Sequence, residues 1–220
     1  MSKGLIASIA LNVFLLASVL GLMYGWPLFI HAKQVMPMRE RHVSFFEEFG
    51  AGPEDVVFVG DQITEEGHWD ELFPGLPVKN RGIAGDTSAD LALRIGQIAA
   101  SKPGKVFLMV GGGDAAAEKS VTETAASFDR ILSRLSTDSP GSEVYVQSIL
   151  PRGDETHDGL TARNDAIREV AEKYGAVWVD LFPLFVAENG TMRDELSNDQ
   201  IHLLASGYLV WRDAIEEHVR

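Results

Sequence analysis

The stretch from Val56 to Thr64 reads VVFVGDQIT, and it decides the fold of this chain. Its first four residues are all apolar and are β-branched or aromatic, as is typical of a strand that is buried on both faces. Gly60 and Asp61 follow at once, and residues of these types favour turns. A short, fully apolar strand that ends in a polar turn indicates a parallel sheet with helices on both faces.

The rest of the chain repeats this pattern of strands and helices. Further apolar runs lie at residues 106–110, 144–149 and 177–179, with a weaker one within 74–79. Segments of helical period lie at 89–98, 125–135, 160–171 and 203–219. This alternation predicts a three-layer α/β/α domain with a parallel five-stranded sheet of the flavodoxin-like kind. In such sheets the functional groups collect at the carboxyl ends of the strands.

A long apolar segment precedes this domain. No side chain between Gly4 and Ile30 is charged, and about 20 apolar residues are enough to span a bilayer as a helix. A cleaved signal peptide is the alternative, but its apolar stretch is usually shorter and ends at small residues. Tyr24 and Trp26 fit a membrane interface instead. We expect a transmembrane anchor over residues 1–32, an amphipathic stalk over 33–52 and the α/β domain over 53–220.

The charges limit the partners and bear on the orientation. Lys33, Arg39 and Arg41 follow the apolar segment and favour a cytoplasmic domain by the positive-inside rule. The very short N-terminus is nevertheless common in exported, anchored proteins, and we expect the domain outside the cytoplasm, for example in a periplasm. The net charge of −13, without a cluster of Lys or Arg, argues against nucleic acid as a partner. The chain has no cysteine, which excludes disulfides and thiolate metal sites.

Four polar motifs follow the predicted strands or precede the last helix. They are GDQIT at 60–64, NRGIAGDT at 80–87, GGGD at 111–114 and DQIH at 199–202. In this order they resemble the SGNH hydrolases, or GDSL-type esterases, whose motifs are G-D-S-I-T, N-x-G-x-x-G-D-T, G-x-N-D and D-x-x-H. The resemblance covers the chain from Val56 onward. The segment FPGLPV at 73–78 is similar to the lysophospholipase-like and acetylesterase-like branch of that family.

This resemblance implies a set of site residues. In the family a serine attacks an ester, a histidine accepts its proton and an aspartate orients the histidine. An asparagine amide and backbone N–H groups stabilise the oxyanion. Carried onto this sequence, His202 is the base, Asp199 orients it and Gly85 supplies a backbone donor. The serine position holds Gln62, and the asparagine position holds Gly113.

The two replaced residues change the expected chemistry. The Gln62 amide has no ionisable proton and cannot form an acyl-enzyme, and Gly113 has no side-chain donor. Loss of one oxyanion donor typically costs about 10²–10³ in rate, and loss of a nucleophilic serine costs about 10⁶ in subtilisin. We therefore expect a catalytically impaired domain that binds a small acylated ligand, either a lipid or an acetylated sugar. The polar loop at 152–158 is expected to border the pocket.

Two active alternatives remain open. A water activated by the Asp199–His202 pair could make the domain an esterase or acyltransferase. A substitute hydroxyl could do the same, and the candidates are Thr64, Thr87 and Ser88. Asp61, Asp114, Asp199 and His202 could also be read as a metal cluster, but the family resemblance implies that Asp61 and Asp114 are structural. We expect neither a metal nor a cofactor.

Overall fold

The chain divides into two compact units, one ending at Ser44 and one running from Phe45 to Arg220. The computed structural model describes residues 3–153 and 155–220. The division falls within the segment that the sequence predicts as a stalk. The helical elements that precede the α/β fold are α1 (Lys3–Leu20), η1 (Gly21–Gly25), α2 (Trp26–Ile30), η2 (His31–Val35) and α3 (Met36–Glu48).

One helix of the first unit is long and apolar enough to cross a membrane. The candidate span covers Lys3–Gly25, and its length and composition are the basis for the assignment. None of its most apolar window is buried. Burial would be expected of a core helix in a soluble domain, so the segment differs from that class. A signal sequence near the N-terminus has the same length and composition.

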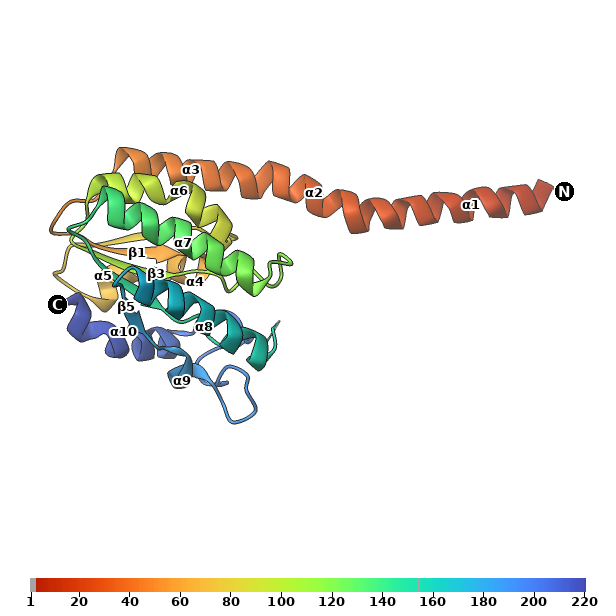
Figure 1. Ribbon diagram of the computed structural model, residues 1–220. Helices are drawn as coiled ribbons and strands as arrows, with labels where there is room; N and C mark the ends of the chain where they lie inside the picture. The colour runs from red at the N-terminus through yellow and green to blue at the C-terminus, as the bar shows by residue number, and fades with distance from the viewer. Residues whose placement is uncertain (1–2, 154) are drawn as a thin grey trace. The chain divides into compact units, whose positions relative to one another are not determined.

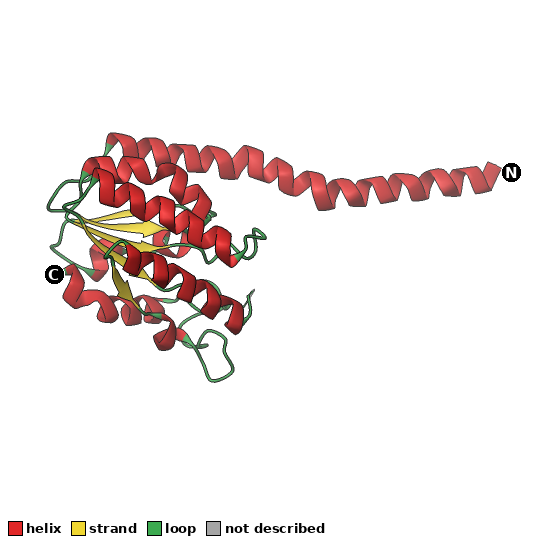
Figure 2. Ribbon diagram, viewed as in Figure 1, coloured by secondary structure: helices red, strands yellow, loops and turns green. Residues whose placement is uncertain are grey.

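The second unit contains a five-stranded parallel sheet, as expected from the sequence (Figures 1 and 2). Its strand order is β2-β1-β3-β4-β5, and every neighbouring pair is parallel. This is the flavodoxin-like order, in which β2 lies on one side of β1 and β3, β4 and β5 follow on the other side. The strands are β1 (Val56–Gly60), β2 (Val78–Gly82), β3 (Lys105–Met109), β4 (Glu143–Gln147) and β5 (Val177–Val179).

Helices cover both faces of this sheet. Three long helices, α6 (Ser88–Ser101), α7 (Val121–Asp138) and α8 (His157–Lys173), pack on one face against Val57, Val59 and Leu108. The opposite face packs against α5 (Trp69–Leu72) and the C-terminal α10 (Ala205–Val219). The short helices α4 (Gln62–Glu65) and α9 (Phe182–Phe185) follow β1 and β5. The predicted three-layer architecture is confirmed.

A stack of aromatic side chains fixes α10 to the sheet. The Phe58 ring stacks on Trp69 with centroids 3.9 Å apart, and Trp69 meets Trp211 of α10 edge to face at 4.9 Å. Trp211 Nε1 donates to Gln147 Oε1 of β4 at 2.6 Å. The Tyr208 hydroxyl donates to the carbonyl of Ile63 in α4 at 2.7 Å. These contacts bring the loop before α10 close to the turn after β1.

The second strand differs from its prediction. The sequence predicts a weak strand within 74–79, whereas β2 runs from Val78 to Gly82 through Lys79, Asn80 and Arg81. Hydrophobicity alone does not indicate these polar residues, because β2 lies at the edge of the sheet and pairs with β1 alone among the described strands. Asn80 stabilises it further, since its Nδ2 donates to the carbonyls of residues 64, 65 and 67 at 2.9–3.1 Å.

Candidate active site

The turn after β1 presents the side chain of Gln62. Asp61 is the N-cap of α4, and its Oδ1 accepts from Ile63 N at 3.2 Å. Gly60 must lack a side chain, because a Cβ there would lie 2.1 Å from the Met109 carbonyl and 2.2 Å from Thr64 Oγ1. The close strand packing therefore requires glycine at 60, and the cap requires a short polar acceptor at 61.

Gln62 contacts the imidazole of His202 directly. The two groups meet through Gln62 Nε2 and His202 Nε2, from residues 140 positions apart. His202 Nδ1 lies 2.5 Å from Asp199 Oδ2. An amide nitrogen can only donate, so the ring nitrogen that faces it must accept. The tautomer that matches this contact has the N–H at Nδ1, beside the aspartate.

Asp199 is held as an anion by the groups around it. The His202 side chain, together with the backbone N–H groups of His202 and Ile201, keeps the pKa of the Asp199 carboxyl well below its usual range. Asp199 Oδ1 accepts from these two N–H groups at 2.8 and 2.9 Å. Asp199 thus orients the base His202, and the amide of Gln62 contacts the opposite nitrogen of the same ring.

The glycines at the two expected oxyanion positions line one cavity with Gln62. The cavity measures about 320 Å³, and Arg152 and Ile201 also line it. Gly85 has a φ of +82°, and a Cβ at Gly85 or at Gly113 would meet no atom within 4 Å. Within residues 3–153 and 155–220, neither glycine N–H has a hydrogen-bond acceptor. The position of the family's asparagine side chain is therefore open space.

Of the three hydroxyls considered as substitute nucleophiles, those of Thr87 and Ser88 bond to other side chains, and that of Thr64 is buried. Thr64 is 1 % exposed and lies against Gly60. Thr87 caps α6, where its hydroxyl bonds to Asp90. Ser88 Oγ donates to Asp114 Oδ2 at 2.5 Å. In the described part of the chain, none of the three is hydrogen-bonded to His202.

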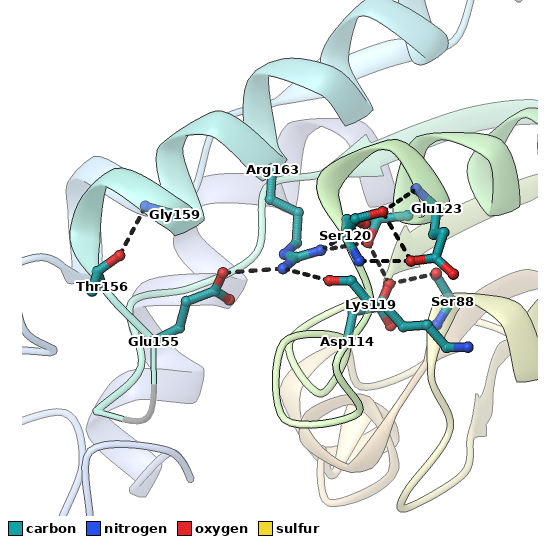
Figure 3. A network of polar contacts seen from close by, with 10 residues as sticks. Ser88, Asp114, Lys119, Ser120, Glu123, Glu155, Thr156, Gly159 and Arg163 are labelled. Carbon is teal, nitrogen blue, oxygen red and sulfur yellow. Dashed lines mark hydrogen bonds and ion pairs between the residues drawn. The ribbon is translucent and has the colours of Figure 1, made fainter.

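Asp114 is the centre of a buried polar network, shown in Figure 3. It accepts from Ser88 N at 2.8 Å and from Thr124 Oγ1 at 2.6 Å, besides the Ser88 hydroxyl. Arg163 of α8 donates to Thr124 Oγ1 at 2.6 Å and to Glu155 Oε1 at 3.1 Å. The network connects the loop that carries Gly113 with the loop that follows β4. Both loops supply walls of the cavity.

The four residues of the conceivable metal cluster have other partners. Asp61 caps α4 and Asp114 belongs to the network just described, whereas Asp199 and His202 bond to each other. Among the residues that the structure describes, no three His, Asp or Glu side chains are grouped as they would be around a metal ion.

Burial changes the acidity of one carboxyl group at the cavity. Asp61 is 7 % exposed, and its burial raises the pKa from 3.8 to about 6. The N–H of Ile63 and the charge of Arg152 act in the opposite direction. Asp86, which also lines the cavity, forms a buried ion pair with Arg94, with Nε and Oδ2 2.6 Å apart.

Sequence reasoning assigned no role to Arg152. The loop at 152–158 was expected to border the pocket, and Arg152 does line the cavity. The arginine packs over the glycine-rich loop, because a Cβ at Gly112 would lie 2.9 Å from Arg152 Nη1. The sequence signal was the run of three glycines at 111–113, which leaves room for a large side chain from elsewhere.

Comparisons with known proteins agree on one family. Residues 48–210 match the profile of the GDSL-like lipase/acylhydrolase family. Platelet-activating factor acetylhydrolase IB subunit alpha2 of Rattus norvegicus is 28 % identical over 165 residues, which cover 70 % of this chain and 71 % of that protein.

Two solved structures share the fold. A Streptococcus pneumoniae protein named for platelet activating factor superposes with a TM-score of 0.78 at 23 % identity, covering 93 % of this chain and 99 % of the other. A GDSL-like lipase from Bacteroides thetaiotaomicron superposes with a TM-score of 0.71 at 20 % identity, covering 81 % and 96 %. At these identities the likeness concerns the fold.

Proposed function

Because this chain belongs to the GDSL-like lipase/acylhydrolase family, we propose that it is a membrane-anchored member that binds an acyl ligand without hydrolysing it through a serine. One observation carries the proposal. Gln62 stands at the turn where the family motif has its serine, and its amide bonds to the imidazole of His202.

Gln62 opposes the family reaction in two ways, through the chemistry of its amide and through its contact with His202. An amide has no ionisable proton, so Gln62 cannot become the attacking group. The amide also occupies His202 Nε2, the ring atom that would otherwise accept a proton from a serine or a water. Gly113 removes a side-chain donor from the oxyanion hole, a loss that typically costs about 10²–10³ in rate by itself. These effects act on one step and do not simply add.

The ligand class follows from the family and from the size of the cavity. The family acts on acyl esters, and the rat relative is named an acetylhydrolase. A cavity of about 320 Å³ lies near the lower end of the range of small-molecule sites. We therefore propose a short acyl group as the part of the ligand that enters the cavity, carried on a lipid or a sugar.

An esterase assay tests this proposal. The full-length chain, purified in a non-ionic maltoside detergent, is incubated with p-nitrophenyl acetate and p-nitrophenyl butyrate. We expect the same background rate from the wild type, from His202→Ala and from His68→Ala, an exposed histidine outside the cavity. Turnover that disappears in His202→Ala but persists in His68→Ala would overturn the proposal. It would favour the second candidate, a water activated by the intact Asp199–His202 pair.

A reversion experiment tests whether the two replaced residues explain the expected inactivity. The double variant Gln62→Ser/Gly113→Asn restores both family residues, and the open space at Gly113 accepts a side chain. We expect turnover that exceeds the wild type and depends on His202. The single variant Gln62→Ser should be slower by about 10²–10³, because it still lacks the amide donor. Absence of any gain in the double variant would refute this account of the site.

The membrane anchor is a separate part of the proposal. The apolar span Lys3–Gly25 supports the anchor, and we propose that the domain lies outside the cytoplasm. After expression in a bacterium, we expect the chain to stay in membranes during alkaline carbonate extraction and to keep its N-terminal segment by intact mass. A soluble chain whose mass lacks this segment would identify a cleaved signal sequence instead. Protease added to intact spheroplasts should digest the domain if it faces outward.

A further inference from the structure

We infer that the cavity beside Gln62 binds the free carboxylate of a short aliphatic acid and that Arg152 is the cation that recognises it. The inference rests on the proposed function, a site that binds an acyl group without hydrolysing it, and it assigns the free acid, rather than its ester, as the species that this site binds most tightly. It adds the chemical identity of the head group, which neither the family nor the proposed function specifies.

The position of Arg152 is the first support. Its guanidinium packs over Gly112, beside the open space at Gly113 where the family motif has an asparagine. A neutral amide suits the oxygen of an ester carbonyl. A guanidinium instead carries a full charge and a planar fork of donors, which matches a carboxylate. The cavity thus lacks the neutral amide of the family motif and has a cationic donor in its wall.

The remaining walls suit the same ligand. The backbone N–H groups of Gly85 and Gly113 line the cavity without an acceptor among the residues that the structure describes. Ala116, Ala117 and Ile201 add apolar surface. A cavity lined by both donors and apolar side chains fits a ligand with an anionic head and a short hydrocarbon body. Inorganic phosphate would use the donors but leave the apolar wall without a partner.

Two acidic residues, Asp61 and Asp86, line the same cavity as Arg152. Asp86 is paired with Arg94 in a buried ion pair. Asp61 is buried and bonded to the N–H of Ile63, and at pH 7.5, above its raised pKa of about 6, its carboxylate opposes an anionic ligand. Arg152 has another polar partner, but a guanidinium has five N–H donors and can serve two acceptors at once.

Ligand-observed NMR titration tests the inference on the full-length chain in maltoside detergent at pH 7.5. The probes are sodium butyrate, its neutral methyl ester and inorganic phosphate. We expect saturable binding of butyrate and at least tenfold weaker binding of the ester and of phosphate. Arg152→Gln should weaken butyrate binding at least tenfold, because a charge-assisted hydrogen bond is lost. The matched control Arg168→Gln removes an exposed arginine of α8, paired with Glu172, and should change nothing.

Two further variants keep the test independent of the folding of Arg152→Gln. Gly112→Ala places a methyl group against Arg152 Nη1 and should shift the guanidinium, weakening butyrate binding severalfold. Asp61→Asn removes the opposing carboxyl and should strengthen butyrate binding. Intrinsic tryptophan fluorescence checks that each variant is folded, since Trp69 and Trp211 are buried.

The outcomes separate this inference from the proposed function. If methyl butyrate binds as tightly as butyrate and neither Arg152→Gln nor Gly112→Ala has an effect, the carboxylate site is refuted while a non-hydrolytic acyl site stands. Tighter binding of phosphate than of butyrate would also refute it. Turnover of p-nitrophenyl esters that disappears in His202→Ala, measured separately, refutes the proposed function and leaves the butyrate result unaffected.

Discussion

Replacing Asp61 by asparagine should stabilise the protein at neutral pH and lose this effect in acid. Asn keeps the cap, because its side-chain oxygen can still accept from Ile63 N. It removes a carboxyl whose pKa is raised by burial from 3.8 to about 6. At about 1.36 kcal/mol for each pKa unit, this difference corresponds to about 3 kcal/mol.

The direction of the pH effect follows from proton binding. Between pH 3.8 and about pH 6 the folded protein holds a proton on Asp61 more tightly than the unfolded chain does. The stability that this residue contributes is therefore complete below pH 3.8 and is lost as the pH rises through 6. Above pH 7 the wild type carries the whole cost of a buried charge, and Asp61→Asn does not. Between pH 4.5 and pH 7.5 the stability difference between variant and wild type should grow by about 2 kcal/mol.

Urea unfolding followed by tryptophan fluorescence measures this difference. The full-length wild type and Asp61→Asn are compared at several values between pH 4.5 and pH 7.5, so that other titrating groups cancel. Asp165→Asn is the matched control, because Asp165 is exposed on α8. Its difference from the wild type should not change with pH. A pH-independent difference for Asp61→Asn, or a loss of stability at pH 7.5, would refute the assigned effect of burial.

Two further predictions concern the framework of the site. Gly85→Ala should lose about 1–2 kcal/mol of stability, because the φ of +82° disfavours any residue with a Cβ. Gly113→Ala should instead be neutral or slightly stabilising. Equal effects of the two substitutions in urea unfolding would contradict this reasoning. Asp86→Asn leaves the buried Arg94 without its ion pair and should cost about 3–5 kcal/mol, much of which the double variant Asp86→Asn/Arg94→Met should recover. An additive loss in the double variant would show that the buried charge is not the cause.

The order of strands and helices could be predicted because it depends on local patterns. The short β-branched run Val56–Val59 is a strand in the structure, and the helical period of 160–171 falls within helix α8. The edge strand β2 was predicted too early, since its hydrogen bonds to β1 stabilise polar residues that hydropathy disfavours. At the edge of a sheet the hydrophobic pattern of the sequence and the hydrogen bonds to the neighbouring strand can favour different residues, and here the hydrogen bonds to β1 set the position of β2.

The site residues likewise divide into those that sequence motifs indicate and those that only the tertiary structure reveals. Gln62, Gly85, Gly113 and the Asp199–His202 pair could be listed from motif order, because each follows a strand end or precedes the last helix. Arg152 could not be assigned a role, since its position depends on a loop packing over glycines that belong to another strand connection.

By itself the sequence determined the three-layer fold, the apolar N-terminal segment and the absence of a hydroxyl and an amide from two motif positions, because these depend only on residue type and spacing. Tertiary structure decided that the amide of Gln62 reaches an imidazole 140 residues away and that a guanidinium enters the cavity beside it. The physical reason is that side chains far apart in the sequence pack against one another. The contacts of Trp211 with Trp69 and Gln147 hold α10 on the sheet and thereby set which side chains meet.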